Sequence, residues 1–485
     1  MKMINISRFS IIAIFLVIVS ACNKDLEPYS SKSDKNALAT PSDLQTATYG
    51  AYAMLKTPYY PLELFWNAIY MSDNVALSGQ TSDPIWNTYN YTHLPNTFNT
   101  EYFWRDAYKA IYSSNLIIER ITEGESPTLD QLKGENLYLR AMSHFFLVRM
   151  FGRPYSQNNG NNPGVPYKNN TLDDLPVRNT VKEVYDFIIE DLLKAVSLMT
   201  DEKNSCYASK EVAYALLSRV YLYMEDNVNA ILYANKVIDS GRYQLMETEP
   251  FKKYFILIPE SNPETIFALR HVPSDNRGED AIGNQFYNIP FGFSGYAETY
   301  ASQTLVDLLL QHPEDARNSF IEPQRNADGT MKMRGLVPKY YVNKFNWQDG
   351  IANLSSPVIF RLAEMYLNRA EANAKLGNDQ LAIDDVNIIR KRAGLSGTAL
   401  YTVDDLKVHA SVLSVVLEER RLEFFYEEPQ RIYDLFRNNL PLIRAYAGWH
   451  GTDHFNFRVE PTDARVIFYI PERELIANPN LTQNP

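Results

Sequence analysis

The chain has 485 residues, a net charge of −11 at pH 7 and many aromatic residues: 33 tyrosines, 24 phenylalanines and 5 tryptophans. The negative charge, spread without long runs of one sign, argues against nucleic acid as a partner, because phosphate backbones bind clustered lysine and arginine. The chain has 2 cysteines, which excludes a small fold stapled by several disulfides. The length suffices for two or three domain-sized cores.

The N-terminus has the three parts of a secretion signal: early positive charge, the apolar run 9–19 and small residues before a cleavage site. The run is too short to span a bilayer, which needs about 20 apolar residues. It ends in VSAC, residues 19–22, which resembles a bacterial lipobox, where the cysteine thiol receives diacylglycerol and palmitate-type chains. A chance cysteine beside an ordinary signal is the alternative. We expect residues 1–21 to be removed and Cys22 to anchor the chain to a bilayer.

Polar residues without periodicity follow, and they predict a flexible tether over 22–40. From residue 41 onward the strong signals are helical. Segments 212–239 and 361–393 resemble each other: each has an Ala/Leu/Tyr-rich helix, a short polar turn and a second helix opening with Ala-Ile. This is the layout of a tetratricopeptide helix pair, and 137–149 resembles a third unit. Because the units are scattered, we expect one curved, mainly α scaffold with long loop-rich insertions and little β structure.

Three turn-rich segments interrupt this pattern, residues 72–100, 154–180 and 272–360. Long loops inside a compact domain are uncommon and often functional. Sugars stack their C–H faces on Trp and Tyr rings, while amides and carboxylates bind the hydroxyl groups. The aromatic loops therefore predict ligand-binding residues, namely Trp86, Asn87, Tyr89, Tyr91, Tyr296, Asn343 and Trp347. The alternative is that each ring packs its own loop. Trp66 and Trp104 lie in helical patterns and are assigned to the core.

The sequence shows no catalytic constellation. Glu423 and Glu427 lie four residues apart, as an acid–base pair on one helix face would, but three arginines are close in sequence: Arg420, Arg421 and Arg431. Ion pairing with them is the expected role. The cluster 450–454, HGTDH, lacks the helical pattern that would favour a metal site. No phosphate loop, nucleophile elbow or HExxH motif occurs. We expect no enzymatic activity, no cofactor and no metal, and we expect Cys206 to be a partly buried hydrophobe.

Seven blocks spread along the chain form an ordered pattern. Three of them are YLRAMSHFFLVRMFG at 138–152, RNTVKEVYDFIIEDL at 178–192 and IPERELIANPNLTQNP at 470–485; the others lie at 208–213, 237–245, 361–372 and 387–394. Together they resemble the SusD/RagB family of outer-membrane lipoproteins of Bacteroidetes, from the lipobox to the last residue. One departure is that Glu428 stands where the family has glycine, with one residue inserted before Arg431. We expect that turn to be reshaped.

The resemblance implies a SusD-like fold with an N-terminal helical region over 41–245 and a C-terminal region over 246–485 that carries the ligand loops. It also implies a surface-exposed, lipid-anchored protein of the outer membrane. Such proteins capture a nutrient, usually a glycan, and deliver it to a SusC-like TonB-dependent transporter. The mechanism would be binding and closure without bond cleavage.

Three other functions remain open at this point. Capture of a peptide or oligopeptide for the same type of transporter fits the same architecture, because aromatic loops serve both ligands. A glycoside hydrolase and a helical-repeat scaffold that gathers other surface proteins are the further alternatives. The loops that would choose the substrate match no motif.

Overall fold

The computed structural model describes residues 37–485 except 78–82, 288–298, 335–336, 428–429 and 447–456, so Cys22 and the predicted signal lie outside it. The chain divides into two compact units, residues 1–47 and 48–485. In the smaller unit, Thr40 and Asp43 cap a helix start reciprocally. The Asp43 amide donates to Thr40 Oγ1 at 3.2 Å, and the Thr40 amide donates to Asp43 Oδ2 at 3.1 Å.

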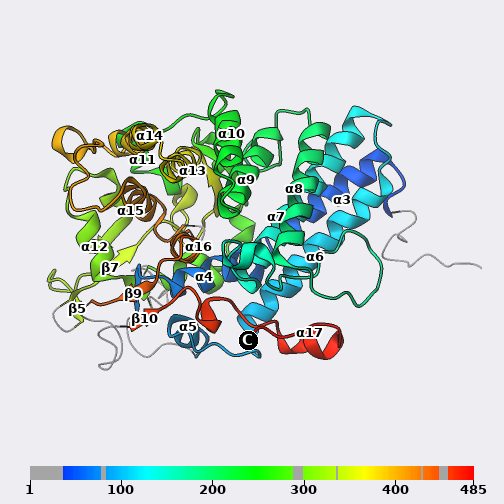
Figure 1. Ribbon diagram of the computed structural model, residues 1–485, viewed down its shortest axis with the longest axis horizontal. Helices are drawn as coiled ribbons and strands as arrows, with labels where there is room; N and C mark the ends of the chain where they lie inside the picture. Colours follow the sequence, from blue (N-terminus) through cyan, green and yellow to red (C-terminus); the bar gives the residue numbers. More distant parts are fainter. Residues whose placement is uncertain (1–36, 78–82, 288–298, 335–336, 428–429, 447–456) are drawn as a thin grey trace, which may run out of the picture. The chain divides into compact units, whose positions relative to one another are not determined.

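Helices dominate the described part of the chain, and the strands are short (Figure 1). The α-helices are α3 (Pro41–Met54), α4 (Tyr59–Met71), α5 (Asp83–Tyr89), α6 (Phe98–Arg120), α7 (Pro127–Phe151), α8 (Val181–Leu198), α9 (Lys210–Tyr223), α10 (Asn227–Ile238), α11 (Thr248–Phe251), α12 (Gln303–Leu309), α13 (Leu362–Lys375), α14 (Asp379–Arg392), α15 (Val412–Phe424), α16 (Arg431–Arg437) and α17 (Glu472–Ala477). The expected mainly α fold is confirmed. Among the described residues, no helix combines the length and the apolar character that crossing a bilayer requires.

The strands form antiparallel two-stranded ladders among the described residues. The ladders are β1 (Val75–Leu77) with β3 (Thr299–Ala301), β2 (Thr265–Ala268) with β8 (Val358–Arg361), β4 (Ile321–Pro323) with β7 (Tyr340–Val342), β5 (Met333–Arg334) with β6 (Val337–Pro338), and β9 (Leu442–Arg444) with β10 (Phe457–Val459). Some ladders join segments close in the sequence, and others, such as β1 with β3, join segments far apart.

The two predicted helix pairs exist and stack on each other. Helices α9 and α10 form one hairpin, α13 and α14 form the other, and α10 packs on α13 (Figure 1). Two small residues, Ala230 of α10 and Ala372 of α13, permit this approach and share one buried cluster with Leu222 of α9. The units are scattered in the sequence but are neighbours in space.

Helix α7, which contains the predicted unit 137–149, packs between α6 and α8. The approach of α7 to α8 requires Gly134, since an added Cβ would lie 2.6 Å from Met199 Cγ and 3.1 Å from the Ala195 carbonyl oxygen. Helix α8 starts at a capping box, in which the side chains of Thr180 and Glu183 bind each other's backbone N–H. This helical layer is continuous with α9, which packs on α8.

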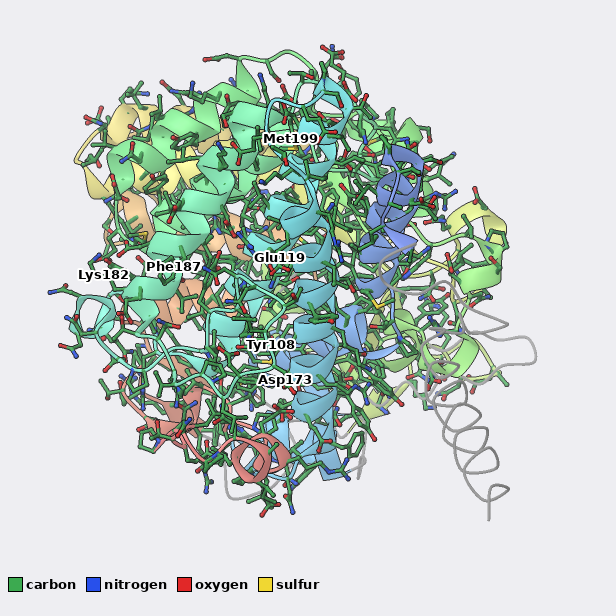
Figure 2. All side chains as sticks on the ribbon, turned by 90° about the vertical axis from the view of Figure 1, so that its right-hand side faces the viewer. Tyr108, Glu119, Asp173, Lys182, Phe187 and Met199 are labelled. Carbon is green, nitrogen blue, oxygen red and sulfur yellow. The ribbon has the colours of Figure 1, made fainter. Side chains whose placement is uncertain are left out.

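The turn-rich segment 154–180 packs against the layer formed by α6, α7 and α8. Tyr108 on α6 donates to the Pro166 carbonyl at 2.7 Å, and the Thr171 amide donates to Glu119 near the end of α6 at 2.8 Å. Figure 2 shows Tyr108, Glu119 and Asp173 in this region, with Phe187 on the neighbouring α8. The Tyr167 ring is stacked between His144 and Phe187, at centroid distances of 4.2 and 4.6 Å. Hydrogen bonds and ring stacking therefore hold this insertion against the helical scaffold.

Candidate functional site

The ladder β1–β3 joins the two aromatic insertions. Val75 pairs with Ala301 and Leu77 with Thr299, and β3 also packs against β7. Because the ladder is antiparallel, the chain leaving Leu77 and the chain entering Thr299 lie at the same end. The insertions 72–100 and 272–360, far apart in sequence, thus meet here. The predicted ligand residue Tyr296 lies outside the described residues.

Helix α5 carries the first group of predicted ligand residues, and Trp86 and Asn87 are both half-buried there. The Trp86 carbonyl accepts from Asn90 Nδ2 at 2.9 Å. Asn87 accepts twice from Thr92, through its carbonyl from the amide at 2.8 Å and through Oδ1 from the hydroxyl at 3.2 Å. These bonds fix the turn that follows α5 and the position of the Asn87 side chain.

Tyr89 and Tyr91 are buried, with 0% and 5% of their surface exposed. The Tyr89 ring lies 3.8 Å from the guanidinium carbon of Arg444, and the Tyr91 hydroxyl donates to the Met71 carbonyl at 2.8 Å. Tyr91 also has a left-handed backbone, with φ of 56°. These two rings shape the loop from inside.

Arg444 organises this region and was not anticipated from the sequence. It is fully buried and donates to carbonyls at the end of α4: to Ser72 at 3.1 Å, and to Tyr70 and Met71 at 2.9 Å each. A guanidinium is well suited to this place, because the last helix carbonyls lack partners and carry partial negative charge. Figure 1 shows β9, which ends at Arg444, beside β10 and α5.

The segment around Trp347 has the opposite pattern, since its exposed ring stands between buried neighbours. Trp347 is 36% exposed, whereas Asn346 and Gln348 are 0% and 1% exposed. The Gln348 amide donates to the Leu354 carbonyl at 3.1 Å and its side chain donates to the His271 carbonyl at 3.0 Å. Trp347 has a φ of 67°, a left-handed conformation that costs a non-glycine residue about 1–2 kcal/mol.

Asn343, the remaining predicted ligand residue, is half-buried at the end of β7. Its amide donates to the Phe320 carbonyl at 3.1 Å, and its side chain approaches the Ser319 carbonyl at 3.4 Å. The side chain is therefore only weakly held by the protein.

Glu423 and Glu427 lie in a buried cluster of ion pairs, which we call the Arg361 cluster. Glu423 pairs with Arg317 at 3.4 Å and also with Arg361 and Arg392. Glu427 pairs with Arg361 at 2.7 Å and Lys344 at 2.8 Å. Burial alone would raise the pKa of Glu423, but the three guanidinium groups outweigh it and hold that pKa well below its ordinary value. These carboxylates are fixed counterions.

Ion pairing of these two glutamates is thus confirmed, but the expected partners are wrong. Arg420 pairs with Asp434 at 2.8 Å, and Arg431, the first residue of α16, pairs with Asp73 at 2.8 Å. Burial acts to raise the pKa of Asp73, yet Arg421 and Arg431 lower it overall. The pairing partners come from other elements of the fold, which helical spacing does not reveal. Glu428, where the turn is expected to be reshaped, lies outside the described residues.

The remaining predictions concern the core and metals. Trp66 and Trp104 are 8% and 2% exposed, as expected for core residues, and Cys206 is half-buried. Among the described ranges, no three His, Cys, Asp or Glu side chains gather as metal ligands would. The cluster HGTDH at 450–454 lies outside those ranges.

Comparisons with known proteins match most of the chain. A family model described as starch-binding and associating with the outer membrane matches residues 24–222, and the SusD family model, which also carries the RagB name, matches residues 317–485. Among curated relatives, the SusD-like protein P38 of Formosa agariphila is 26% identical, over 100% of this chain and 99% of its own. The starch-binding protein SusD of Bacteroides thetaiotaomicron is 24% identical, over 80% and 79%.

Solved structures are also similar to this chain. A SusD superfamily protein from Bacteroides thetaiotaomicron has a TM-score of 0.82 and 29% identity, covering 92% of this chain and 100% of its own. A putative sugar binding protein from Bacteroides vulgatus has a TM-score of 0.78 and 26% identity, covering 92% and 98%.

Proposed function

Since the chain belongs to the SusD/RagB family, we propose that it is an outer-membrane protein, anchored through lipid on Cys22, that captures a glycan at the cell surface. It passes the glycan to a SusC-like TonB-dependent transporter. Relatives described as starch-binding or sugar-binding support a carbohydrate as the ligand. The division into an N-terminal region over 41–245 and a C-terminal region over 246–485 is part of the proposal.

The exposure of Trp347 is the observation that carries the ligand class. A protein gains stability by burying a tryptophan, yet Trp347 is 36% exposed while the residues on either side are buried. The left-handed backbone at Trp347 stores strain, and such strain is typical of functional sites. The ring is a flat, fixed platform of the kind on which a pyranose stacks.

The other predicted residues differ in how accessible they are to a ligand, and we assign them different roles. Trp86, Asn87 and Asn343 are half-buried, so part of each side chain is accessible to a sugar. Tyr89 and Tyr91 support the loop beneath, and Tyr296 belongs to the segment next to β3. Acid–base cleavage finds no support at Glu423 and Glu427, because arginine and lysine occupy both carboxylates. The protein therefore acts by binding.

Native gel electrophoresis in gels containing soluble starch, xylan or galactomannan tests the ligand class. We expect at least one polysaccharide to retard the protein, and Trp347→Ala to reduce the retardation. Tyr112→Ala is the matched control, because Tyr112 is 49% exposed on α6 and belongs to neither aromatic insertion. Retardation by none of a broad polysaccharide set, together with binding of peptides, would refute glycan capture. New reducing ends after incubation would refute a purely binding role.

The anchor and the transporter need separate tests. Cys22→Ser should move the protein from the membrane fraction to the soluble fraction while polysaccharide retardation persists. The wild-type protein, extracted gently, should copurify with a TonB-dependent transporter. If Cys22→Ser stays in the membrane fraction, lipid on Cys22 is not the anchor.

A further inference from the structure

A cavity lies at the edge of the insertion 272–360, of which only Val272 belongs to its lining. It has a volume of about 260 Å³ and is lined by residues of the α3 end, the turn before α9, and the segment that follows β2. Its lining contains no residue of 72–100 or of 276–360. The volume is large enough for a small organic group, whereas the smaller cavity beside it, lined partly by Arg277 and Asn353, holds about 20 Å³, roughly one water.

Tyrosine rings form one wall of the cavity. Tyr207 lies 5.9 Å from Tyr49 and 5.2 Å from Tyr52, centroid to centroid, and meets Tyr52 edge-on. The Tyr52 hydroxyl donates to Glu135 at 2.9 Å and accepts from the Ala208 amide at 2.8 Å, so its polar end is used inside the protein. Tyr52 therefore presents only its ring, and Tyr49, with 46% of its surface exposed, lies at the mouth.

Polar groups also line the cavity. Arg270 and Glu260 pair at 3.0 Å, and both line the cavity together with Asn204. The Asn204 side-chain oxygen accepts from the Cys206 amide at 3.0 Å, which fixes the amide plane and leaves its NH₂ group as a donor. The cavity thus combines aromatic faces with preset donors and acceptors.

The charges in the cavity are already balanced. Lys56 on its rim pairs with Asp275 at 2.7 Å, and Arg270 pairs with Glu260. A phosphate or a carboxylate ligand would need an uncompensated cation to offset its desolvation. A neutral polyol does not, because its hydroxyl groups both donate to Glu260 and accept from Arg270 and Asn204. The lining therefore favours a neutral sugar.

From this arrangement we propose that the cavity between Tyr207 and Arg270 is a second binding site, which takes a neutral sugar unit of a glycan. The inference rests on the proposed glycan capture and extends it, since two sites on one protein hold a long chain more firmly than one. A structural link joins the two sites. His271 is buried between cavity residues Arg270 and Val272, and its carbonyl accepts from the side chain of Gln348, next to Trp347.

Cys206 lines the same cavity and provides a local reporter. Burial raises the pKa of its thiol to about 12, with nearby Glu260 adding to the effect, so the thiol is protonated and slow to react near neutral pH. Cys22 is the other cysteine of the chain. In the Cys22→Ser protein, the alkylation rate at Cys206 therefore measures access to this cavity alone.

The experiment measures that rate with N-ethylmaleimide at pH 8 by intact mass. It is run without ligand and with millimolar maltohexaose, cellohexaose, xylohexaose or mannohexaose, and calorimetry reports overall binding of the same sugars. We expect a sugar that binds to slow alkylation at least fivefold, in the Cys22→Ser protein and in its Trp347→Ala variant. Tyr207→Ala should abolish the protection, and Tyr207→Phe, which keeps the ring, should retain it. Tyr112→Ala should change nothing.

The outcomes separate the two proposals. If a sugar binds by calorimetry in a Trp347-dependent way but leaves the Cys206 rate unchanged, the second site is refuted and glycan capture stands. Protection that disappears in Trp347→Ala also refutes the second site, because the effect then originates at the Trp347 loop. If no neutral oligosaccharide binds or protects, both proposals fail.

Discussion

Arg361 and Trp347 are near each other in the sequence, but the environments of the Arg361 cluster and of the loop around Trp347 are opposite. In the cluster, arginines and glutamates are removed from water and each carboxylate faces several cations. In the loop, the polar residues beside Trp347 are buried while the large apolar ring is left in contact with solvent. Abundant charge in the interior therefore marks the part that holds the fold together, whereas the exposed ring is the part that we propose meets a ligand.

The largest expected effect comes from removing a carboxylate of the Arg361 cluster. Glu423→Ala leaves Arg317, Arg361 and Arg392 with fewer counterions in a buried site. Breaking a buried pair on one side costs about 3–5 kcal/mol of unfolding free energy. Urea unfolding at pH 7 measures it. Sugar binding by the fraction that remains folded should be unchanged, and a loss below 1 kcal/mol would contradict the structural role of the cluster.

Glu63 sharpens the comparison, because it is a buried carboxyl in α4 without a cation in contact among the described residues. Burial raises its pKa to about 8, against weaker lowering by Asn99 and Asn67. A carboxyl whose pKa is higher in the folded state binds protons more tightly there, so the protein loses stability as pH rises from about 4.5 to 8. Glu63→Gln should remove this loss and stabilise the protein by about 4 kcal/mol at pH 8.

Thermal and urea unfolding of both proteins at pH 5, 7 and 9 check this prediction. The difference between wild type and Glu63→Gln should grow with pH. A difference that is independent of pH would show that the side-chain amide acts through packing and that the carboxyl does not titrate in this range.

Trp347→Gly separates backbone strain from ligand contact. Glycine adopts φ of 67° without steric cost, so the unfolding free energy should stay within about 1 kcal/mol of wild type. Affinity for whichever of the four hexasaccharides binds should fall at least tenfold, about 1.4 kcal/mol, as measured by calorimetry. Trp347→Phe, which keeps a ring, should lose less. Equal affinity in wild type and Trp347→Gly would remove this residue from the site.

The smallest effect is expected at an exposed ion pair. Lys182 and Asp186 lie 2.6 Å apart on α8, and each side chain is 49% exposed (Lys182 is labelled in Figure 2). Such a pair contributes about 0.3–0.5 kcal/mol. Asp186→Ala should therefore change the unfolding free energy by no more than about 0.5 kcal/mol, and added salt should shrink even that difference. A loss as large as that of Glu423→Ala would undo the distinction between buried and exposed charge.

The helix pairs were predictable because apolar periodicity and small residues are local signals, carried by Ala230 and its neighbours within each repeat. The environment of the candidate site was not predictable from such local signals. Tyr89 is covered by Arg444, which lies in a strand near the other end of the chain, and nothing beside Tyr89 indicates it. The ligand role of the aromatic residues stays a prediction, although the union of the two insertions at β1–β3 is consistent with it.

The packing of α10 on α13 has a consequence for how the chain folds. Ala230 and Leu222 cannot be buried in this cluster before Ala372 is present, and the ribosome adds Ala372 only after the entire intervening insertion has been made. Contacts this distant in sequence form slowly. A nascent chain therefore leaves the apolar side of the α9–α10 hairpin uncovered while the segment between α10 and α13 is being made.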